Sequence, residues 1–146
     1  MFTDEYFMRK ALNEAHKACE KDEVPVGAVI VADNRIIARA YNLTETLNDV
    51  TAHAEMQAIT IAASYLGGKY LKECTLYVTL EPCLMCAGAL YWAQITRIVY
   101  GATDTKRGFS LNPSSPLHPA STVTSGILET ECAALLTNFF RKKRRL

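Results

Sequence analysis

Two short segments, His53-Ala54-Glu55 and Pro82-Cys83-Leu84-Met85-Cys86, limit what this chain can be more than any other part of its sequence. An imidazole and two thiolates are typical zinc ligands, and a zinc site with three protein ligands keeps a fourth position for water. Zinc lowers the pKa of such a water toward neutrality, which makes it a nucleophile. Glu55 is a carboxylate that can carry the protons of that water without binding the metal. The two segments therefore indicate a hydrolytic zinc site.

The spacing of these residues predicts that two helices begin at the metal. Cys83 and Cys86 are three positions apart, so on a helix they share one face about one turn apart. Pro82 fits the first turn of that helix, where its missing N–H costs nothing, and the positive helix N-terminus favours thiolates. Residues 53–55 are expected to open a second helix in the same way. The cap-type residues that precede it are Asp49 and Thr51.

Hydrophobic periodicity divides the rest of the chain into alternating helices and strands. A first helix is expected to be capped by Thr3, and Gly67-Gly68 is expected to end the helix that begins near residue 53. Strands are predicted at 26–31, 35–41, 76–80, 97–101 and 122–124, with a tight turn at 33–34, an irregular segment at 102–120 and a last helix from about residue 128. This α-β-β-α-β-α-β-β-α order predicts an α/β fold with helices on both faces of a mixed sheet.

Composition is that of one soluble domain, which we expect to span residues 1–146. No apolar run is long enough to cross a membrane, and no secretory signal is visible at the N-terminus. The number of cysteines is odd, which favours metal binding with buried free thiols at Cys19, Cys74 and Cys132 over a disulfide framework. Five of the sixteen basic residues form a tail at 141–146, whereas all fifteen acidic residues precede it. Such a basic tail is typical of nucleic-acid binding, although it also fits a solvated helix end.

These segments resemble the zinc-dependent cytidine/adenosine deaminase superfamily, whose known signature is H-x-E with P-C-x-x-C. Residues 23–29, 75–81 and 132–141 also resemble the bacterial tRNA-specific adenosine deaminase family, so the resemblance covers nearly the whole chain. It implies a cytidine-deaminase-like three-layer α/β/α sandwich with a mixed five-stranded sheet. It further implies one Zn²⁺ per subunit, a homodimer, a cytoplasmic location and a tRNA anticodon stem-loop as partner.

In that family the reaction converts adenosine to inosine at the wobble (first anticodon) position of tRNA. The resemblance assigns His53, Cys83 and Cys86 as zinc ligands and Glu55 as the catalytic acid and base. The residues that it assigns to substrate binding are Val26, Asn42, Ala54, Asp104, Phe140 and Arg141. Phe139-Phe140 beside arginine is a reasonable platform for an unstacked base.

Two other functions remain open from the sequence. The zinc residues would serve equally well in a deaminase of a free nucleobase or nucleoside, such as guanine, cytosine or cytidine. Tyr91-Trp92, which we otherwise expect in the core or at an interface, also occurs in guanine deaminases of the superfamily. A structural zinc site in a nucleic-acid-binding module is the third possibility, but it needs a fourth protein ligand. The candidates for that ligand are His118, Cys19, Cys74 and Cys132, none of which has a clear ligand spacing.

Overall fold

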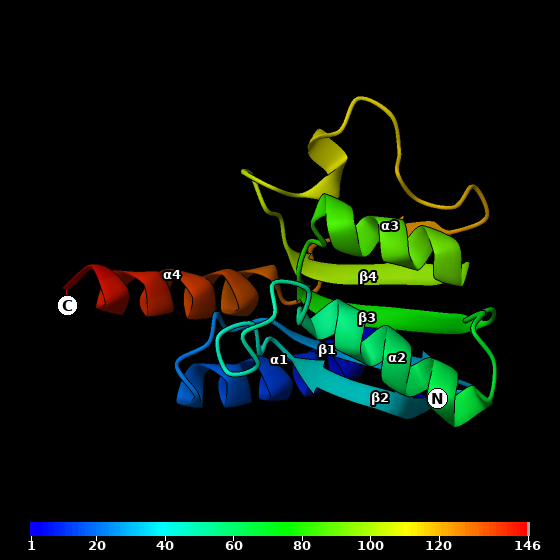
Figure 1. The fold of residues 1–146 in the computed structure, drawn as a ribbon, viewed down its shortest axis with the longest axis horizontal. Helices are drawn as coiled ribbons and strands as arrows, with labels where there is room; N and C mark the ends of the chain where they lie inside the picture. The colour runs from blue at the N-terminus through cyan, green and yellow to red at the C-terminus, as the bar shows by residue number, and fades with distance from the viewer. Residues whose placement is uncertain (146) are drawn as a thin grey trace.

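The computed structural model describes residues 1–145, in which helices and strands follow one another in the predicted order (Figure 1). Leu146, the last residue of the expected basic tail, lies outside the described residues. The elements are α1 (Asp4–Glu20), β1 (Gly27–Ala32), β2 (Arg35–Tyr41), α2 (Ala54–Leu66), β3 (Cys74–Leu80), α3 (Leu84–Ala93), β4 (Arg97–Ala102), β5 (Thr122–Thr124) and α4 (Glu129–Arg145). A 3-10 turn, η1 (Phe109–Leu111), interrupts the segment that was expected to be irregular.

The five strands form one mixed sheet in the order β2-β1-β3-β4-β5. β1 pairs antiparallel with both β2 and β3, whereas β3, β4 and β5 run parallel to one another. The β1–β2 hairpin turns at Asp33 and Asn34, whose φ values of 50° and 60° suit the small polar residues that tolerate this conformation. The predicted turn and the predicted mixed sheet are therefore confirmed.

Alternate residues of the central strands enter two separate cores, so the fold has three layers. Ile30, Leu76 and Ile98 face α2 and α3, whereas their sequence neighbours Val29 and Tyr77 face α1 and α4. Figure 1 shows α2 and α3 side by side on one face of the sheet and α1 on the other. The predicted three-layer sandwich is confirmed.

α1 lies unusually close to the sheet at Gly27. A Cβ atom at this position would lie 2.1 Å from the carbonyl oxygen of Ala11 and 2.3 Å from the amide nitrogen of Ala15. The backbone of β1 therefore touches the backbone of α1, a distance that only glycine permits. The backbone N–H of Gly27 also donates to Thr79 Oγ1 at 3.1 Å, which fixes β1 against β3.

Two of the predicted helix starts differ in detail from the structure. Thr3 caps α1 as expected, because its hydroxyl accepts from the backbone N–H of Tyr6. The N-cap of α2, however, is His53, since Asp49 turns back to accept from Thr51 in a local turn. The N-cap of α3 is Cys83, which places Pro82 just outside the first turn. Gly67 ends α2 with a φ of 73°, as predicted.

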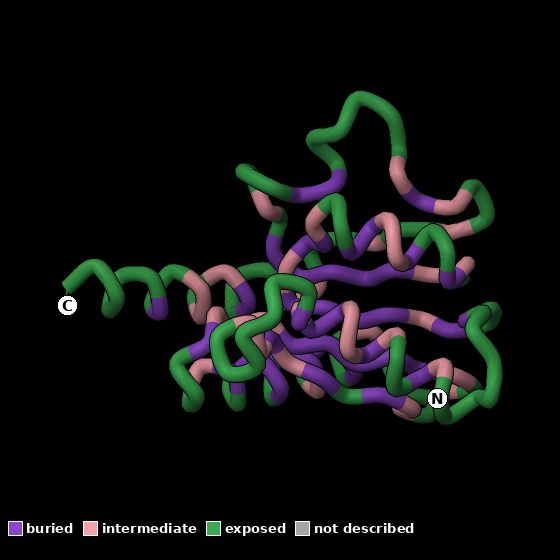
Figure 2. The backbone as a smooth tube through the Cα atoms, in the orientation of Figure 1, coloured by how far each residue is buried: buried purple, intermediate pink, exposed green. Residues whose placement is uncertain are grey.

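α4 packs on the sheet by its first turns and extends beyond the rest of the molecule by its last ones (Figures 1 and 2). Phe139 is buried, with 8% of its surface exposed, whereas Phe140 is 43% exposed. The expected Phe139-Phe140 platform therefore reduces to Phe140. None of the helices in residues 1–145 is long and apolar enough to cross a membrane.

Candidate zinc centre and surrounding cavity

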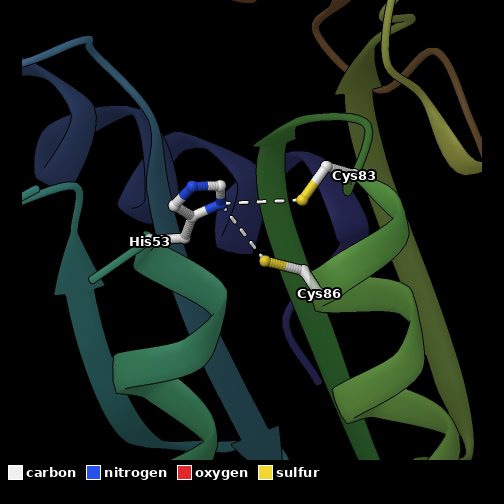
Figure 3. Close-up of side chains that lie close together, drawn as sticks. All are labelled: His53, Cys83 and Cys86. Carbon is white, nitrogen blue, oxygen red and sulfur yellow. Dashed lines mark hydrogen bonds between the residues drawn. The ribbon is translucent and has the colours of Figure 1, made fainter. Parts of the chain in front are cut away.

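The three expected ligands meet between the first turns of α2 and α3. Nδ1 of His53 lies 3.7 Å from Sγ of Cys83 and 3.4 Å from Sγ of Cys86 (Figure 3). Figure 3 shows the imidazole pointing from the start of α2 toward the two sulfur atoms at the start of α3. α3 follows β3 almost directly, whereas the longer segment 42–53 leads from β2 to α2. Both helices pack on the same face of the sheet, which places their first turns side by side.

These separations fit a zinc ion. Zinc–nitrogen and zinc–sulfur bonds of about 2.0 and 2.3 Å at a tetrahedral angle place the nitrogen and sulfur about 3.5 Å apart. The observed distances of 3.7 and 3.4 Å lie on either side of that value. Of the residues the structure describes, only His53, Cys83 and Cys86 form such a ligand group, and their ligand atoms all lie within 4.8 Å of one another. A closed four-ligand structural site is thus not formed within residues 1–145.

The pKa values of the two thiols are shifted in opposite directions. The pKa of Cys83 falls to about 4, chiefly because the thiol of Cys86 donates a hydrogen bond to it and the imidazole of His53 adds a second. The pKa of Cys86 is raised, because its proton is held by that hydrogen bond and its thiol is buried. The site therefore carries one thiolate before a cation binds, and a divalent cation deprotonates a coordinating thiol outright.

Glu55 lies one residue into α2, directly beside the ligand group. Only 4% of its surface is exposed. Burial raises the pKa of its carboxyl to about 7, while a backbone hydrogen bond and the charge of His53 oppose the shift. A carboxyl with a pKa near neutrality can both accept and release a proton at working pH, which is what a general acid and base requires.

A cavity of about 820 Å³ opens over the zinc ligands. Its wall includes His53, Glu55 and Cys83. Five of the residues expected to bind substrate also line it: Val26, Asn42, Ala54, Asp104 and Phe140. Arg141, the sixth, is not among the lining residues. Arg144, one turn further along α4, takes its place in the wall.

Asn42 and Asp104 stand on opposite loops of this cavity. Asn42 is only 7% exposed, at the end of β2, where its backbone N–H donates to the carbonyl of Val26. Asp104 follows β4, and its Oδ1 accepts from the backbone N–H groups of Lys106 and Arg107, both at 3.0 Å. The side-chain amide of Asn42 can therefore face a nucleobase bound in the cavity. The turn that Asp104 stabilises brings the side chains of Lys106 and Arg107 to the cavity wall.

The mouth of the cavity combines positive charge with an aromatic ring. Lys106 and Arg107 approach it from the loop after β4, and Phe140 and Arg144 from α4. Phe140 and Arg144 are four positions apart and so share one face of the helix. Cationic side chains of this kind bind the phosphate backbone of a single-stranded nucleic acid, and an aromatic ring stacks on an unpaired base.

Two buried carboxylates that the sequence reasoning did not single out hold the loops of the cavity. Glu23 is fully buried, and it accepts from the backbone N–H groups of Glu45 and Thr46 at 3.1 and 2.6 Å. Glu81 is 2% exposed and accepts from those of Asp104 and Ser110 at 3.0 and 2.9 Å. Glu81 directly precedes the P-C-x-x-C segment, and this adjacency was the one signal that could have drawn attention to it.

The remaining candidates lie away from the zinc centre. His118 packs against Tyr91, with ring centroids 5.7 Å apart, and accepts from the backbone N–H of Ala120. Cys74 and Cys132 are buried free thiols as expected, whereas Cys19 is only partly buried. Trp92 is 76% exposed, so the expectation of a core position is wrong for this residue and only the interface remains.

The comparison with known proteins agrees with this geometry. The family model for the cytidine and deoxycytidylate deaminase zinc-binding region matches residues 1–102. A tRNA-specific adenosine deaminase of Agrobacterium fabrum is 51% identical over 95% of each chain. A solved structure from studies of A-to-I editing by tRNA:A34 deaminases at the wobble position is 50% identical, with a TM-score of 0.83 over 90% of this chain and 99% of that one.

A guanine deaminase from Bacillus subtilis also has a similar structure. It is 42% identical, with a TM-score of 0.68, over 71% of this chain and 67% of that one. Its similarity covers less of the chain than that of the tRNA-specific enzymes, which extends through nearly all of it. From its zinc-binding sequence, its fold and these full-length relatives, the chain belongs to the zinc-dependent cytidine and deoxycytidylate deaminase family, and within it to the tRNA-specific adenosine deaminases.

Proposed function

We propose that the protein hydrolyses adenosine to inosine and ammonia at the wobble position of a tRNA anticodon. The observation that carries this proposal is a single cavity that joins a three-ligand zinc centre, a buried Glu55 and a mouth with cations and an aromatic ring. The first two features supply hydrolytic deamination, and the third supplies a site for a single-stranded RNA loop. The full-length relatives that are tRNA-specific adenosine deaminases support the same substrate.

His53, Cys83 and Cys86 hold the zinc ion, one in each subunit. Zinc held there would supply a water molecule with a lowered pKa, which is the nucleophile that attack on C6 of adenine needs. Glu55 would take one proton from that water and deliver it to a ring nitrogen of the purine as the C6–O bond forms. It would then carry the second proton, from the hydroxyl on C6, to the amino group, so that the C6–N bond breaks and ammonia leaves. Ala54 and Val26 form the wall beside the ring, and the amide of Asn42 offers both a donor and an acceptor to its edge.

The RNA is held outside the ring pocket. Asp104 orders the loop that carries Lys106 and Arg107, while Phe140 and Arg144 close the other side of the mouth. Arg141 and the basic residues that follow it up to Arg145 lie on the same helix, where they can contact the RNA beyond the flipped base. A free nucleobase would use none of these groups, so they favour RNA over the second candidate, a nucleobase deaminase.

The working form that we propose is a cytoplasmic homodimer joined through α2 and α3. Their outer surface exposes a set of large apolar side chains: Ile61, Tyr65, Leu66, Leu84, Met85, Tyr91 and Trp92. Exposed apolar surface of this extent is typical of a protein–protein interface. The free thiols and thiolate ligands suit a reducing compartment.

Sedimentation of the wild type and of Ile61→Asp tests the dimer, with Asn13→Asp on the exposed face of α1 as the matched control. A monomeric wild type would contradict it.

Deamination assays on a substrate panel test the proposed function. The panel contains an anticodon stem-loop with adenosine at the first anticodon position, the same stem-loop with that adenosine moved to the stem, and free adenosine, guanine, cytosine and cytidine. We expect inosine only in the first substrate. Turnover of a free base with an inert stem-loop would replace the proposal with nucleobase deamination by the same zinc centre.

A further inference from the structure

Glu81 is a buried carboxylate whose charge no cationic side chain within residues 1–145 neutralises. It is 2% exposed and forms no ion pair with any residue in that range. Its two oxygens are instead divided between two ends of one loop. Oε1 accepts from the backbone N–H of Asp104 at 3.0 Å, and Oε2 accepts from that of Ser110 at 2.9 Å. Hydrogen bonds to a buried charge are stronger than neutral ones, so this carboxylate fixes both ends of the loop.

The loop held in this way lies directly along the zinc-ligand segment. The backbone N–H of Phe109 donates to the carbonyl of Pro82 at 3.0 Å, and Cys83 forms an antiparallel bridge with Gly108. The same loop supplies residues 103–107 to the wall of the cavity. One short segment, 81–83, therefore carries both a metal ligand and the anchor of a substrate wall.

Gly108 shows how closely the carboxylate fits beneath the loop. A Cβ atom at this position would lie 2.3 Å from Oε1 of Glu81 and 2.6 Å from the carbonyl oxygen of Asp104. The space above the carboxylate is thus filled by loop backbone, and any side chain at position 108 would push the two apart.

We propose that Glu81 is a positioning residue, which sets the distance between the zinc ligand Cys83 and the cavity wall at residues 103–107. Its kinetic consequence rests on the proposed function, because the wall would hold the nucleotide over the metal. Small displacements of a bound reactant cost large factors in rate, so a wall fixed to the metal-ligand segment maintains the reactive geometry. Glu81 is one of the residues that line the cavity, but both of its oxygens are engaged by the loop amides, so it acts through the loop.

Glu23 provides an internal comparison on the opposite side of the cavity. It is as deeply buried as Glu81, and it accepts from the backbone N–H groups of Glu45 and Thr46 in the loop after β2. A substitution of either carboxylate by an amide keeps the shape but turns one acceptor into a donor that faces an N–H group. The two substitutions therefore perturb equally buried positions but release different walls.

The test compares Glu81→Gln, Gly108→Ala, Glu23→Gln and the exposed control Glu20→Gln in the zinc-loaded full chain. Amide hydrogen exchange is followed by NMR, and zinc content and kcat/KM on the anticodon stem-loop are measured on the same samples. In Glu81→Gln and Gly108→Ala we expect the Asp104 and Ser110 amides to exchange on the order of tenfold to a hundredfold faster, as the removal of a hydrogen bond to a buried charge predicts. Zinc content and exchange in β1 and β3 should stay at the wild-type level.

Glu23→Gln should accelerate exchange at Glu45 and Thr46 instead and leave Asp104 and Ser110 protected. We expect kcat/KM per bound zinc to fall at least tenfold in Glu81→Gln and to stay unchanged in Glu20→Gln. Unchanged exchange at Asp104 and Ser110, or faster exchange throughout the core, would overturn the proposal. A wild type that leaves the stem-loop unmodified would refute the proposed function only, because the exchange measurement still tests the position of the loop.

Discussion

Gly27→Ala is the substitution that the packing of α1 on β1 opposes most directly. The added Cβ would lie 2.1 Å from the Ala11 carbonyl oxygen and 2.3 Å from the Ala15 nitrogen, and both are backbone atoms that cannot rotate away. To restore ordinary van der Waals separation, α1 would have to move by about 1 Å. That movement would separate Phe7 and Met8, which are almost fully buried, from the sheet.

Overpacking of this kind costs about 3 kcal/mol in the free energy of unfolding. For a chain of this length such a decrease lowers the melting temperature by about 6–12 °C. The measurement is thermal unfolding of the zinc-loaded protein, followed by circular dichroism. Gly68→Ala is the matched control, because a Cβ there meets nothing within 4 Å and its φ is not in the left-handed region. A Gly27→Ala protein that melts at the wild-type temperature would show that the contact between α1 and β1 tolerates a side chain at this position.

Three other predictions concern acid stability, the metal and the tail. Two hydrogen bonds of 2.7 Å from Arg97 hold the pKa of Asp4 below its ordinary value of 3.8. The pair therefore stabilises the fold at pH values above 3.8, and this stabilisation is lost as the pH falls through the lowered pKa. Asp4→Asn should therefore cost about 1–2 kcal/mol at neutral pH in urea unfolding, and a gap from wild type that persists below the lowered pKa would contradict this. Cys86→Ser removes one of the three ligands, so it should reduce the amount of bound zinc at least tenfold at limiting metal, as measured by atomic absorption. Full retention of zinc would show that Cys86 does not bind the metal. Removal of residues 141–146 should lower the slope of log K against log salt for stem-loop binding by about 0.7 for each phosphate that the tail neutralises, and an unchanged slope would show that the tail is only a solvated helix end.

The order of elements was predictable because each element has a local pattern in the sequence. β1 and β3 are visible there as short runs of apolar and β-forming residues, which the structure buries on both faces of the sheet. The turn residues at 33–34 and the helix end at Gly67, all with positive φ, are visible as well. The helix caps were less predictable, because several cap-type residues lie close together before α2. Asp49 forms a local turn with Thr51, so the cap falls to His53, whose side chain points to the metal site instead of capping the helix.

The zinc centre was predictable because its ligands lie in two short segments whose spacing matches helix starts. The loop anchors were not, since Glu23 and Glu81 are isolated carboxylates in sequence and act on loops about twenty to thirty residues away in the chain. The choice between Arg141 and Arg144 depends on the rotation of α4 about its axis, which the sequence around the basic tail leaves open. Its packing turns Phe139 inward and Phe140 with Arg144 toward the cavity.

Glu55 moves the protons in the zinc-dependent deamination of RNA adenosine that we propose. The most direct test measures inosine formation in the adenosine-bearing anticodon stem-loop by the wild type and by Glu55→Gln, with zinc content determined on both. We expect full zinc in both proteins and inosine with the wild type. The rate with the variant should be lower by a factor on the order of a thousand or more, because the amide cannot take up a proton. A zinc-loaded Glu55→Gln protein that forms inosine at the wild-type rate would contradict it.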